Sequence, residues 1–210
     1  GLFWKEVWLK HVWRRPFWLT DSYGVKLRIH PSSGDDFPWL SVLSAESHFD
    51  DPPVLDLVRE LISPNGTVID VGACFGQFAL FVAQLVRNDG AVHAFEWVSS
   101  SFRRLIENCA GNPDLADRIR VNRQAVSHYD GIATMHVFPT EHAVWNSLAS
   151  HAMYGANGLV LPSATEWVPC VTLDTYCEVN GLGVIDLIKV DVEGFETEVL
   201  QGAKHLIDEG

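Results

Sequence analysis

Cysteine is scarce in this sequence, and long apolar runs are missing. The 210 residues contain 4 cysteines and no CxxC pair, which is too few for a disulfide framework in a chain of this length. No run approaches the ~20 apolar residues that span a bilayer, and the first residues do not follow the order of a secretory signal. The sequence therefore favours a soluble, cytoplasmic protein with reduced thiols.

Basic residues are also few. Fifteen Lys plus Arg stand against 27 Asp plus Glu, a net charge of −12, and a surface this acidic repels a phosphate backbone, so we expect no nucleic-acid partner. The 9 histidines form no HExxH or HxH grouping, so no required metal is indicated. With 47% hydrophobic residues, the chain has the composition of one packed α/β domain with a short appendage.

The appendage is the N-terminal segment, residues 1–22, which is rich in tryptophan. Its first twenty residues carry four basic side chains and one acidic side chain. Trp4, Trp8 and Val12 repeat every four residues before Pro16, which predicts a short amphipathic helix. Two uses of this helix stay open. Residues 4–18 would make peripheral contact with a membrane, or the helix would cover the domain core or a sister subunit in a homo-oligomer.

Strands alternating with helices are predicted for the rest of the chain. The lead-in, residues 23–65, holds an alternating strand at 23–30 and helical spacing at 54–61. Four apolar runs predict core strands: 67–72, 91–96, 118–125 and 184–192. Apolar residues at helical spacing lie between or after these runs and predict helices at 78–85, 102–109 and 195–206. Two extra strands, at 133–138 and 167–172, flank an irregular segment, 139–166. This order predicts an α/β fold with a mostly parallel, Rossmann-like sheet.

The most informative stretch is VIDVGACFGQF, residues 68–78. The strand ends near Asp70, and glycines in the following turn would let the backbone approach a ligand at the start of a helix. Twenty residues after Gly76, Glu96 ends the second strand, where a carboxylate can accept hydrogen bonds from both ribose hydroxyls, with Trp97 placed to lie against an adenine. The GxGxxG spacing of dinucleotide-binding proteins is absent, which disfavours a nicotinamide-dependent oxidoreductase.

Over residues 23–208 the sequence resembles the S-adenosylmethionine-dependent methyltransferases of the FkbM type. The stretches that carry the resemblance are VIDVGACFG, AVHAFE, QAVSHYDG, VTLD and IDLIKVDVEGFETEVLQGA. The resemblance implies the class I methyltransferase fold, a three-layer α/β sandwich, with residues 66–210 as the domain that binds S-adenosylmethionine. Such sheets have seven strands, so we expect the C-terminal strands to be missing after the helix that follows the fourth core strand.

The resemblance also implies which residues hold the cofactor. The turn after the first strand would hold the methionine end and Glu96 the ribose, while the residues that close the third strand would border the adenine. The implied set is Asp70, Gly72, Ala73, Cys74, Gly76, Glu96, Trp97, Gln124 and Ala125. One departure is Cys74, where such turns usually carry Asn, a residue that tolerates left-handed backbone better.

Methyl transfer to a hydroxyl requires alignment of the reacting atoms and help in removing a proton. Asp191 and Glu193 follow the fourth strand at the edge where parallel sheets bind ligands, and Lys189 shares their alternation, so these three are the candidate catalytic residues. The alternative for Glu193 is that it caps the next helix. Three polar residues of the irregular segment are candidates for contact with the acceptor: His142, Asn146 and Ser147.

The resemblance points to an O-methyltransferase that acts on a hydroxyl of a sugar, a glycan or a natural product. A second reading, motivated by Cys74 and by the missing strands, is a cofactor-binding or scaffold module without catalysis. A nicotinamide-dependent oxidoreductase is the third.

Overall fold

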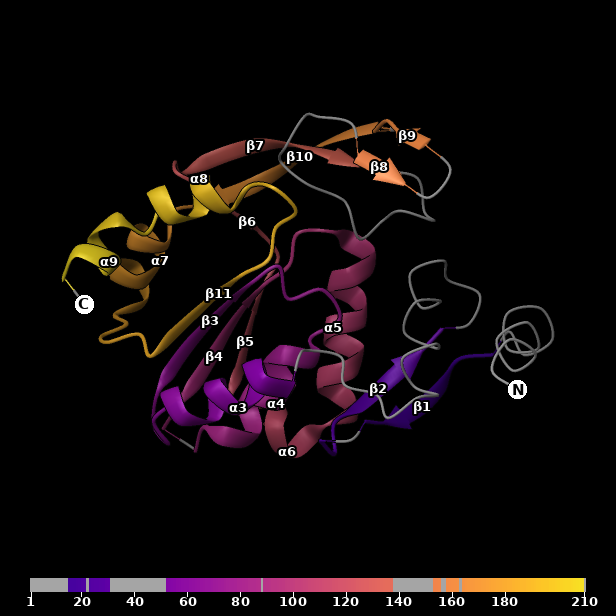
Figure 1. Ribbon diagram of the computed structural model, residues 1–210, viewed down its shortest axis with the longest axis vertical. Helices are drawn as coiled ribbons and strands as arrows, with labels where there is room; N and C mark the ends of the chain where they lie inside the picture. The colour runs from indigo at the N-terminus through magenta and orange to yellow at the C-terminus, as the bar shows by residue number, and fades with distance from the viewer. Residues whose placement is uncertain are drawn as a thin grey trace.

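A four-stranded parallel sheet forms the centre of the computed structural model (Figure 1). The structure describes residues 15–21, 23–30, 52–87, 89–137, 153–155, 158–162 and 164–209. The strands are β3 (Thr67–Val71), β4 (Ala91–Phe95), β5 (Ile119–Asn122) and β11 (Leu187–Val190), in the order β11-β3-β4-β5. Strand β3, the first of these four along the chain, lies between β11 and β4. The order of the strands therefore reverses at β3, and a reversal of this kind opens a crevice at the carboxyl ends of the strands.

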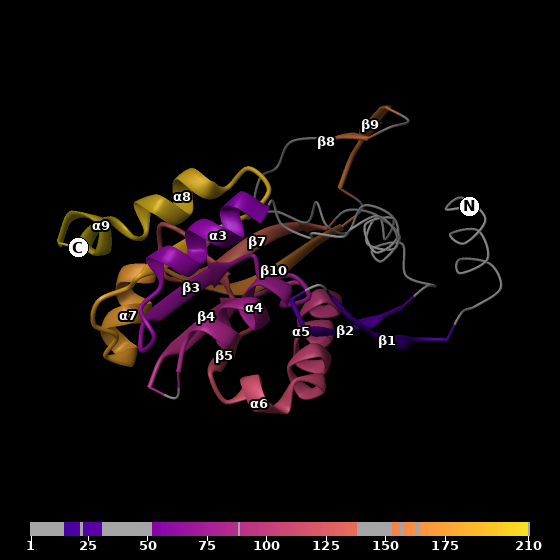
Figure 2. The ribbon, with the colours of Figure 1, turned by 60° about the horizontal axis from the view of Figure 1, so that its bottom comes forward.

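Alternate residues of the strands belong to two separate hydrophobic cores. On one face, Val68 and Val92 pack with α3 (Pro52–Leu61), α4 (Gln77–Leu85) and α5 (Ser99–Gly111), with α6 (Pro113–Ala116) beside them. On the other face, Ile69 and Phe95 pack with α7 (Leu173–Asn180), α8 (Glu196–Gln201) and the start of α9 (Lys204–Glu209). Figure 2 shows this second helix group at the end of the molecule opposite β1 and β2. The result is the expected three-layer, Rossmann-like arrangement.

The third predicted strand, 118–125, is two strands in two different sheets. Strand β5 ends at Asn122, whose side-chain amide donates to the carbonyl of Arg120 and so satisfies that group locally. The chain then bends, and β6 (Ala125–Val126) pairs with β10 (Ala164–Val171), with Ala125 opposite Cys170. Strand β10 also pairs antiparallel with β7 (Gly131–Val137), and β8 (Met153–Gly155) pairs with β9 (Gly158–Val160). Periodicity could not show that the chain changes sheets.

The N-terminal segment, residues 1–22, is not helical throughout, because the chain forms a strand after Pro16. Residues 17–20 form strand β1 (Phe17–Thr20), antiparallel to β2 (Lys26–Ile29), which lies inside the strand predicted at 23–30. Half-buried Phe17 and Leu19 alternate with exposed residues and pack on the first core, so a period of two governs this stretch after Pro16. The rest of the prediction, at residues 1–14, lies outside the described residues.

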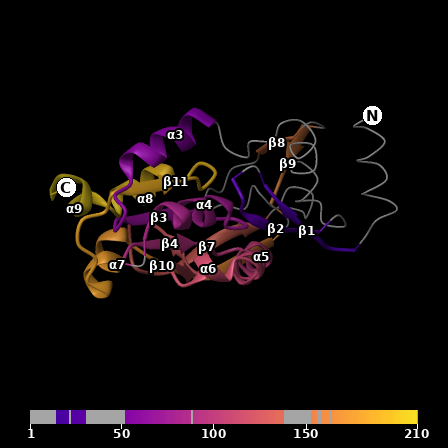
Figure 3. The same cartoon turned by 90° about the horizontal axis from the view of Figure 1, so that it is seen from below.

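Strand β2 is held to α5 by two buried asparagine side chains. Asn108 accepts the N–H of Arg28 at 2.7 Å. Asn112 accepts the N–H of Lys26 at 3.0 Å and donates to its carbonyl at 2.8 Å. Figure 3 shows α5 beside β2, seen from below. These side chains satisfy the backbone of β2 on the edge that does not pair with β1.

The C-terminal helix predicted at 195–206 is divided into α8 and α9. A Cβ atom on Gly202 would lie 2.0 Å from the carbonyl oxygen of Ser127, so the chain passes too close there for any other residue. Asp174 then accepts the N–H groups of His205 and Leu206, both at 3.1 Å, at the start of α9. Among the helices of the described ranges, none is long and apolar enough to cross a membrane.

Candidate functional site

The turn between β3 and α4 is enclosed by the end of β11 and by α5. Gly72 and Gly76 have φ values of 82° and 83°. A Cβ on Gly72 would lie 1.9 Å from the carbonyl oxygen of Asp191, and one on Gly76 would lie 2.2 Å from Cδ1 of Leu105. These glycines therefore make room for neighbouring parts of the chain, which is a different reason from the ligand approach expected from the sequence. Cys74 is also left-handed, with φ 51°.

Glu96 connects the end of β4 with this turn. The residue is 6% exposed, and Oε2 accepts the N–H of Cys74 at 2.9 Å while Oε1 accepts the N–H of Val98 at 2.7 Å. Burial raises the pKa of Glu96 to about 7; the two amides oppose this shift, and the nearby Asp70 adds to it. A carboxylate is thus held in place between the turn and the start of α5.

Lys189 lies between two carboxylates at the ends of β3 and β11. The parallel register places it opposite Asp70, and its Nζ lies 3.3 Å from Oδ1 of the fully buried Asp70 and 3.5 Å from Oδ2 of Asp191. The Asp191 side chain is 66% exposed, whereas that of Lys189 is 22% exposed. The lysine therefore restrains the carboxylate of Asp191 at the edge of the site.

The segment after β11 carries Glu193 in a fixed loop. Glu193 has φ 52° and is followed by Gly194 with φ 90°. The carboxylate that caps the loop is that of Glu196, whose Oε1 accepts the N–H groups of Val192 at 3.3 Å and Gly194 at 3.1 Å. These bonds hold the loop before α8, and the alternative role of Glu193, as a cap of that helix, stays a prediction. Burial, and then the charges of Asp191 and Glu196, raise the pKa of Glu193.

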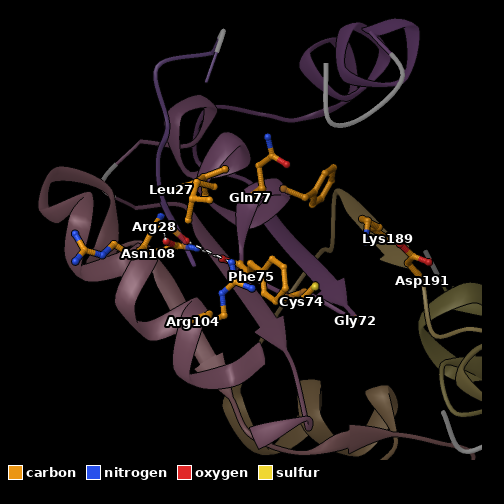
Figure 4. Close-up of a pocket in the computed structure, with 13 residues that line it drawn as sticks. Leu27, Arg28, Gly72, Cys74, Phe75, Gln77, Arg104, Asn108, Lys189 and Asp191 are labelled. Carbon is orange, nitrogen blue, oxygen red and sulfur yellow. Dashed lines mark hydrogen bonds and ion pairs between the residues drawn. The ribbon is translucent and has the colours of Figure 1, made fainter. Parts of the chain in front are cut away.

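A pocket adjoins these residues (Figure 4). It contains about 600 Å³ of empty space, part of it open to solvent. One end is formed by the turn and the end of β11, and the other by β2 and α5. The lining residues are Leu27, Arg28, Ile29, Gly72, Ala73, Cys74, Phe75, Gln77, Phe78, Arg104, Asn108, Lys189 and Asp191.

Several lining residues were not among the candidates from the sequence, and three of them, Arg28, Arg104 and Asn108, lie together at the end formed by β2 and α5. Arg104 stacks on Phe75, with Cζ 3.5 Å from the ring centroid, and its Nη2 donates to the carbonyl of Arg28 at 3.3 Å. Asn108 donates to the carbonyl of Phe75 at 2.8 Å. The sequence does hold one indication of these residues: Arg104, Asn108 and Asn112 are polar and follow one another at four-residue spacing, beside the apolar stripe of α5. We call Arg28, Arg104 and Asn108 the α5 wall.

Trp97, Gln124 and Ala125 are not among the residues that line this pocket. Trp97 is half-buried and packs against the small core of the second sheet, which includes Ala125. Gln124 is half-buried in the bend between β5 and β6. The candidates for acceptor contact, His142, Asn146 and Ser147, lie outside the described residues.

The fold and the motifs at the strand ends are those of the class I methyltransferases. The model of the methyltransferase FkbM domain matches residues 70–209, so the chain belongs to this family. The methyltransferase FkbM from Methylobacillus flagellatus KT is similar in structure, with 15% identity over 91% of this chain and 43% of that chain and a TM-score of 0.44.

A second solved structure is P. horikoshii TYW2 in complex with MeSAdo, with 18% identity over 53% of this chain and 37% of that chain and a TM-score of 0.37. The chain thus spans about two fifths of the length of these solved structures. No curated protein matches the sequence.

Proposed function

We propose that the protein is an S-adenosylmethionine-dependent O-methyltransferase that transfers a methyl group to a hydroxyl of a sugar, a glycan or a natural product. The observation that carries this proposal is the buried carboxylate of Glu96, held against the turn after β3 in a chain of the FkbM family. It stands at the carboxyl edge of the sheet, beside the point where the strand order reverses.

The carboxylate oxygens of Glu96 are acceptors suited to the hydroxyls of a ribose. Each of its oxygens accepts one backbone N–H, and a carboxylate oxygen has two lone pairs, so each oxygen retains acceptor capacity toward a ribose hydroxyl. The turn from Gly72 to Gly76 would hold the amino-acid end, near the first N–H groups of α4. The fully buried Asp70 would act behind this turn, by holding Lys189. When bound, S-adenosylmethionine supplies a methyl group on a sulfonium.

The residues after β11 would take the proton from the acceptor hydroxyl. A carboxyl group with a raised pKa binds a proton more readily near neutral pH, which suits Glu193 for the role of general base. Glu196 fixes the loop backbone on both sides of Glu193, so the carboxylate keeps its place. Asp191, restrained by Lys189 at the pocket edge, would orient the acceptor.

Calorimetry with S-adenosylmethionine and with NADH tests the proposal. We expect S-adenosylmethionine to bind and Glu96→Ala to weaken it about 10- to 100-fold, because hydrogen bonds to a charged group are lost. Glu178→Ala, an exposed change on α7, is the matched control and should bind as the unchanged chain does. Binding of NADH alone would contradict the family function.

Turnover needs a separate assay. A screen with a labelled methyl donor against sugar, glycan and natural-product acceptors should yield a labelled ether. A chain that binds S-adenosylmethionine and labels none of these acceptors would be the non-catalytic module instead.

A further inference from the structure

We propose that Asn108 is a positioning residue for the cofactor: by holding the carbonyl of Phe75, it fixes the turn that would bind the amino-acid end of S-adenosylmethionine. This inference rests on the proposed function, because it assigns a role in binding the same cofactor. It concerns a side chain of α5 that would act through the backbone of the turn, without touching the cofactor.

The turn after β3 is closed by a backbone hydrogen bond. The N–H of Gly76 donates to the carbonyl of Ala73 at 2.8 Å, with the left-handed Cys74 inside the turn. The chain before it is anchored to β4, because the N–H groups of Gly72 and Ala73 both donate to the carbonyl of Phe95, at 3.0 and 2.9 Å. The sheet therefore holds the first half of the turn, and the second half depends on contacts from elsewhere.

Asn108 holds the second half of the turn (Figure 4). Its Nδ2 donates to the carbonyl of Phe75 at 2.8 Å. This carbonyl belongs to the same peptide group as the N–H of Gly76, which closes the turn. One planar peptide group is thus held on both sides, by the turn itself and by a side chain of α5.

The orientation of this peptide group determines how α4 begins. Gly76 follows it with φ 83° and ψ 17°, and the carbonyl of Gly76 accepts the N–H of Leu80 at 2.9 Å in the first turn of the helix. Glycine adopts left-handed and right-handed backbone about equally well, so Gly76 itself would not resist a rotation of the peptide group before it. The contact with Asn108 opposes this rotation, and it therefore sets the direction of the N–H groups that would meet the cofactor carboxylate.

The amide of Asn108 is fixed before any ligand arrives. The residue is 1% exposed, and its Oδ1 accepts the N–H of Arg28 at 2.7 Å while its Nδ2 donates to Phe75. A Cβ atom on Gly76 would meet Leu105, three residues before Asn108, so the same face of α5 packs on the turn. A donor held in this way loses little entropy when the site is used.

Asn108 and Glu96 hold the turn at two different points. Glu96 accepts the N–H of Cys74, whereas Asn108 donates to the carbonyl of the next residue, Phe75. Glu96 is also held by the N–H of Val98, which does not belong to the turn. Loss of the Asn108 side chain should therefore disturb the part of the turn that would bind the amino-acid end and leave the part that would bind the ribose.

Asn112, at the C-terminal end of α5, offers a matched control. It is 8% exposed and bonds to the backbone of β2 as Asn108 does, through the N–H and the carbonyl of Lys26. A further hydrogen bond goes to the backbone carbonyl of Asn108. Both asparagines stabilise the packing of β2 on α5, and the contact with Phe75 distinguishes Asn108.

Calorimetry on the full chain tests the inference with two ligands: S-adenosylhomocysteine, which carries the amino-acid end, and methylthioadenosine, which lacks it. We expect Asn108→Ala to weaken S-adenosylhomocysteine about 10- to 100-fold and methylthioadenosine by less than about 2-fold. Asn112→Ala should lower the midpoint of urea unfolding, as Asn108→Ala does, and leave both affinities unchanged. The proposal would be overturned if Asn108→Ala weakened both ligands equally or neither, or if Asn112→Ala showed the same selective loss.

A measurement on the unchanged chain keeps the test decisive if Asn108→Ala does not fold. The NMR signals of the Asn108 side-chain NH₂ group should shift when S-adenosylhomocysteine is added and stay in place with methylthioadenosine, because the carbonyl that they bind belongs to the turn. Signals that respond to both ligands alike, or to neither, would overturn the inference and leave the proposed function in place. A chain that binds neither ligand would remove both.

Discussion

The buried Glu96 should make the stability of the protein depend on pH. In the unfolded chain its pKa is 4.5 and in the folded protein about 7. Between these values the unfolded chain releases a proton that the folded protein keeps, so the free energy of unfolding falls as pH rises. The fall is complete above about pH 7. A difference of about 2.5 pKa units corresponds to roughly 3 kcal/mol.

Urea unfolding of the unchanged chain and of Glu96→Gln measures this loss. In Glu96→Gln, the NH₂ group faces one of the two backbone N–H donors, which lowers the free energy of unfolding by an amount that does not vary with pH. The stability of Glu96→Gln minus that of the unchanged chain should therefore rise by roughly 3 kcal/mol from about pH 4 to about pH 8. Glu178→Gln, which changes an exposed carboxylate, should follow the unchanged chain. A Glu96→Gln difference that stays constant with pH would refute the reasoning.

Three further predictions concern the turn and the end of β11. Cys74→Asn should raise the free energy of unfolding by up to about 1 kcal/mol, because asparagine tolerates φ 51° better; lower stability in chemical denaturation would contradict this. Lys189→Met should cost roughly 3 kcal/mol in the same assay, since it leaves buried Asp70 without this cation, and adding Asp70→Asn should restore most of the loss. Asp191→Asn and Glu193→Gln should lower kcat about 10²-fold or more with little effect on the Kd of S-adenosylmethionine, and unchanged kcat in both would remove them from the chemistry.

The sequence predicted those parts of the site that lie on single elements. Strands β3 and β4 fall within the predicted runs, and Glu96 lies at the end of β4 as the spacing indicated. Such features depend on local periodicity and on the distance along the chain between two strand ends. Helix α7 was missed although its boundaries are marked in the sequence: Thr172 accepts the N–H of Thr175 at the start, and Gly181 ends the helix with φ 62°.

The α5 wall could not be predicted for a different reason. Arg28 and Arg104 are 76 residues apart, and their contact depends on how β2 packs across α5. The same limit explains why the sequence did not show that Ala125 belongs to a second sheet, because its pairing partner Cys170 comes much later in the chain. Periodicity describes which face of an element is apolar, but not which distant element covers it.

The asparagine pair on α5 has a consequence for how molecules of this protein behave at high concentration. A two-stranded hairpin exposes backbone donors and acceptors along its outer edges, and such edges invite pairing with the strand of another molecule. Along β2, Asn108 and Asn112 occupy these groups at Arg28 and Lys26. The hairpin edge that faces α5 is thereby closed to intermolecular strand addition, so the helix protects the protein against one route to aggregation.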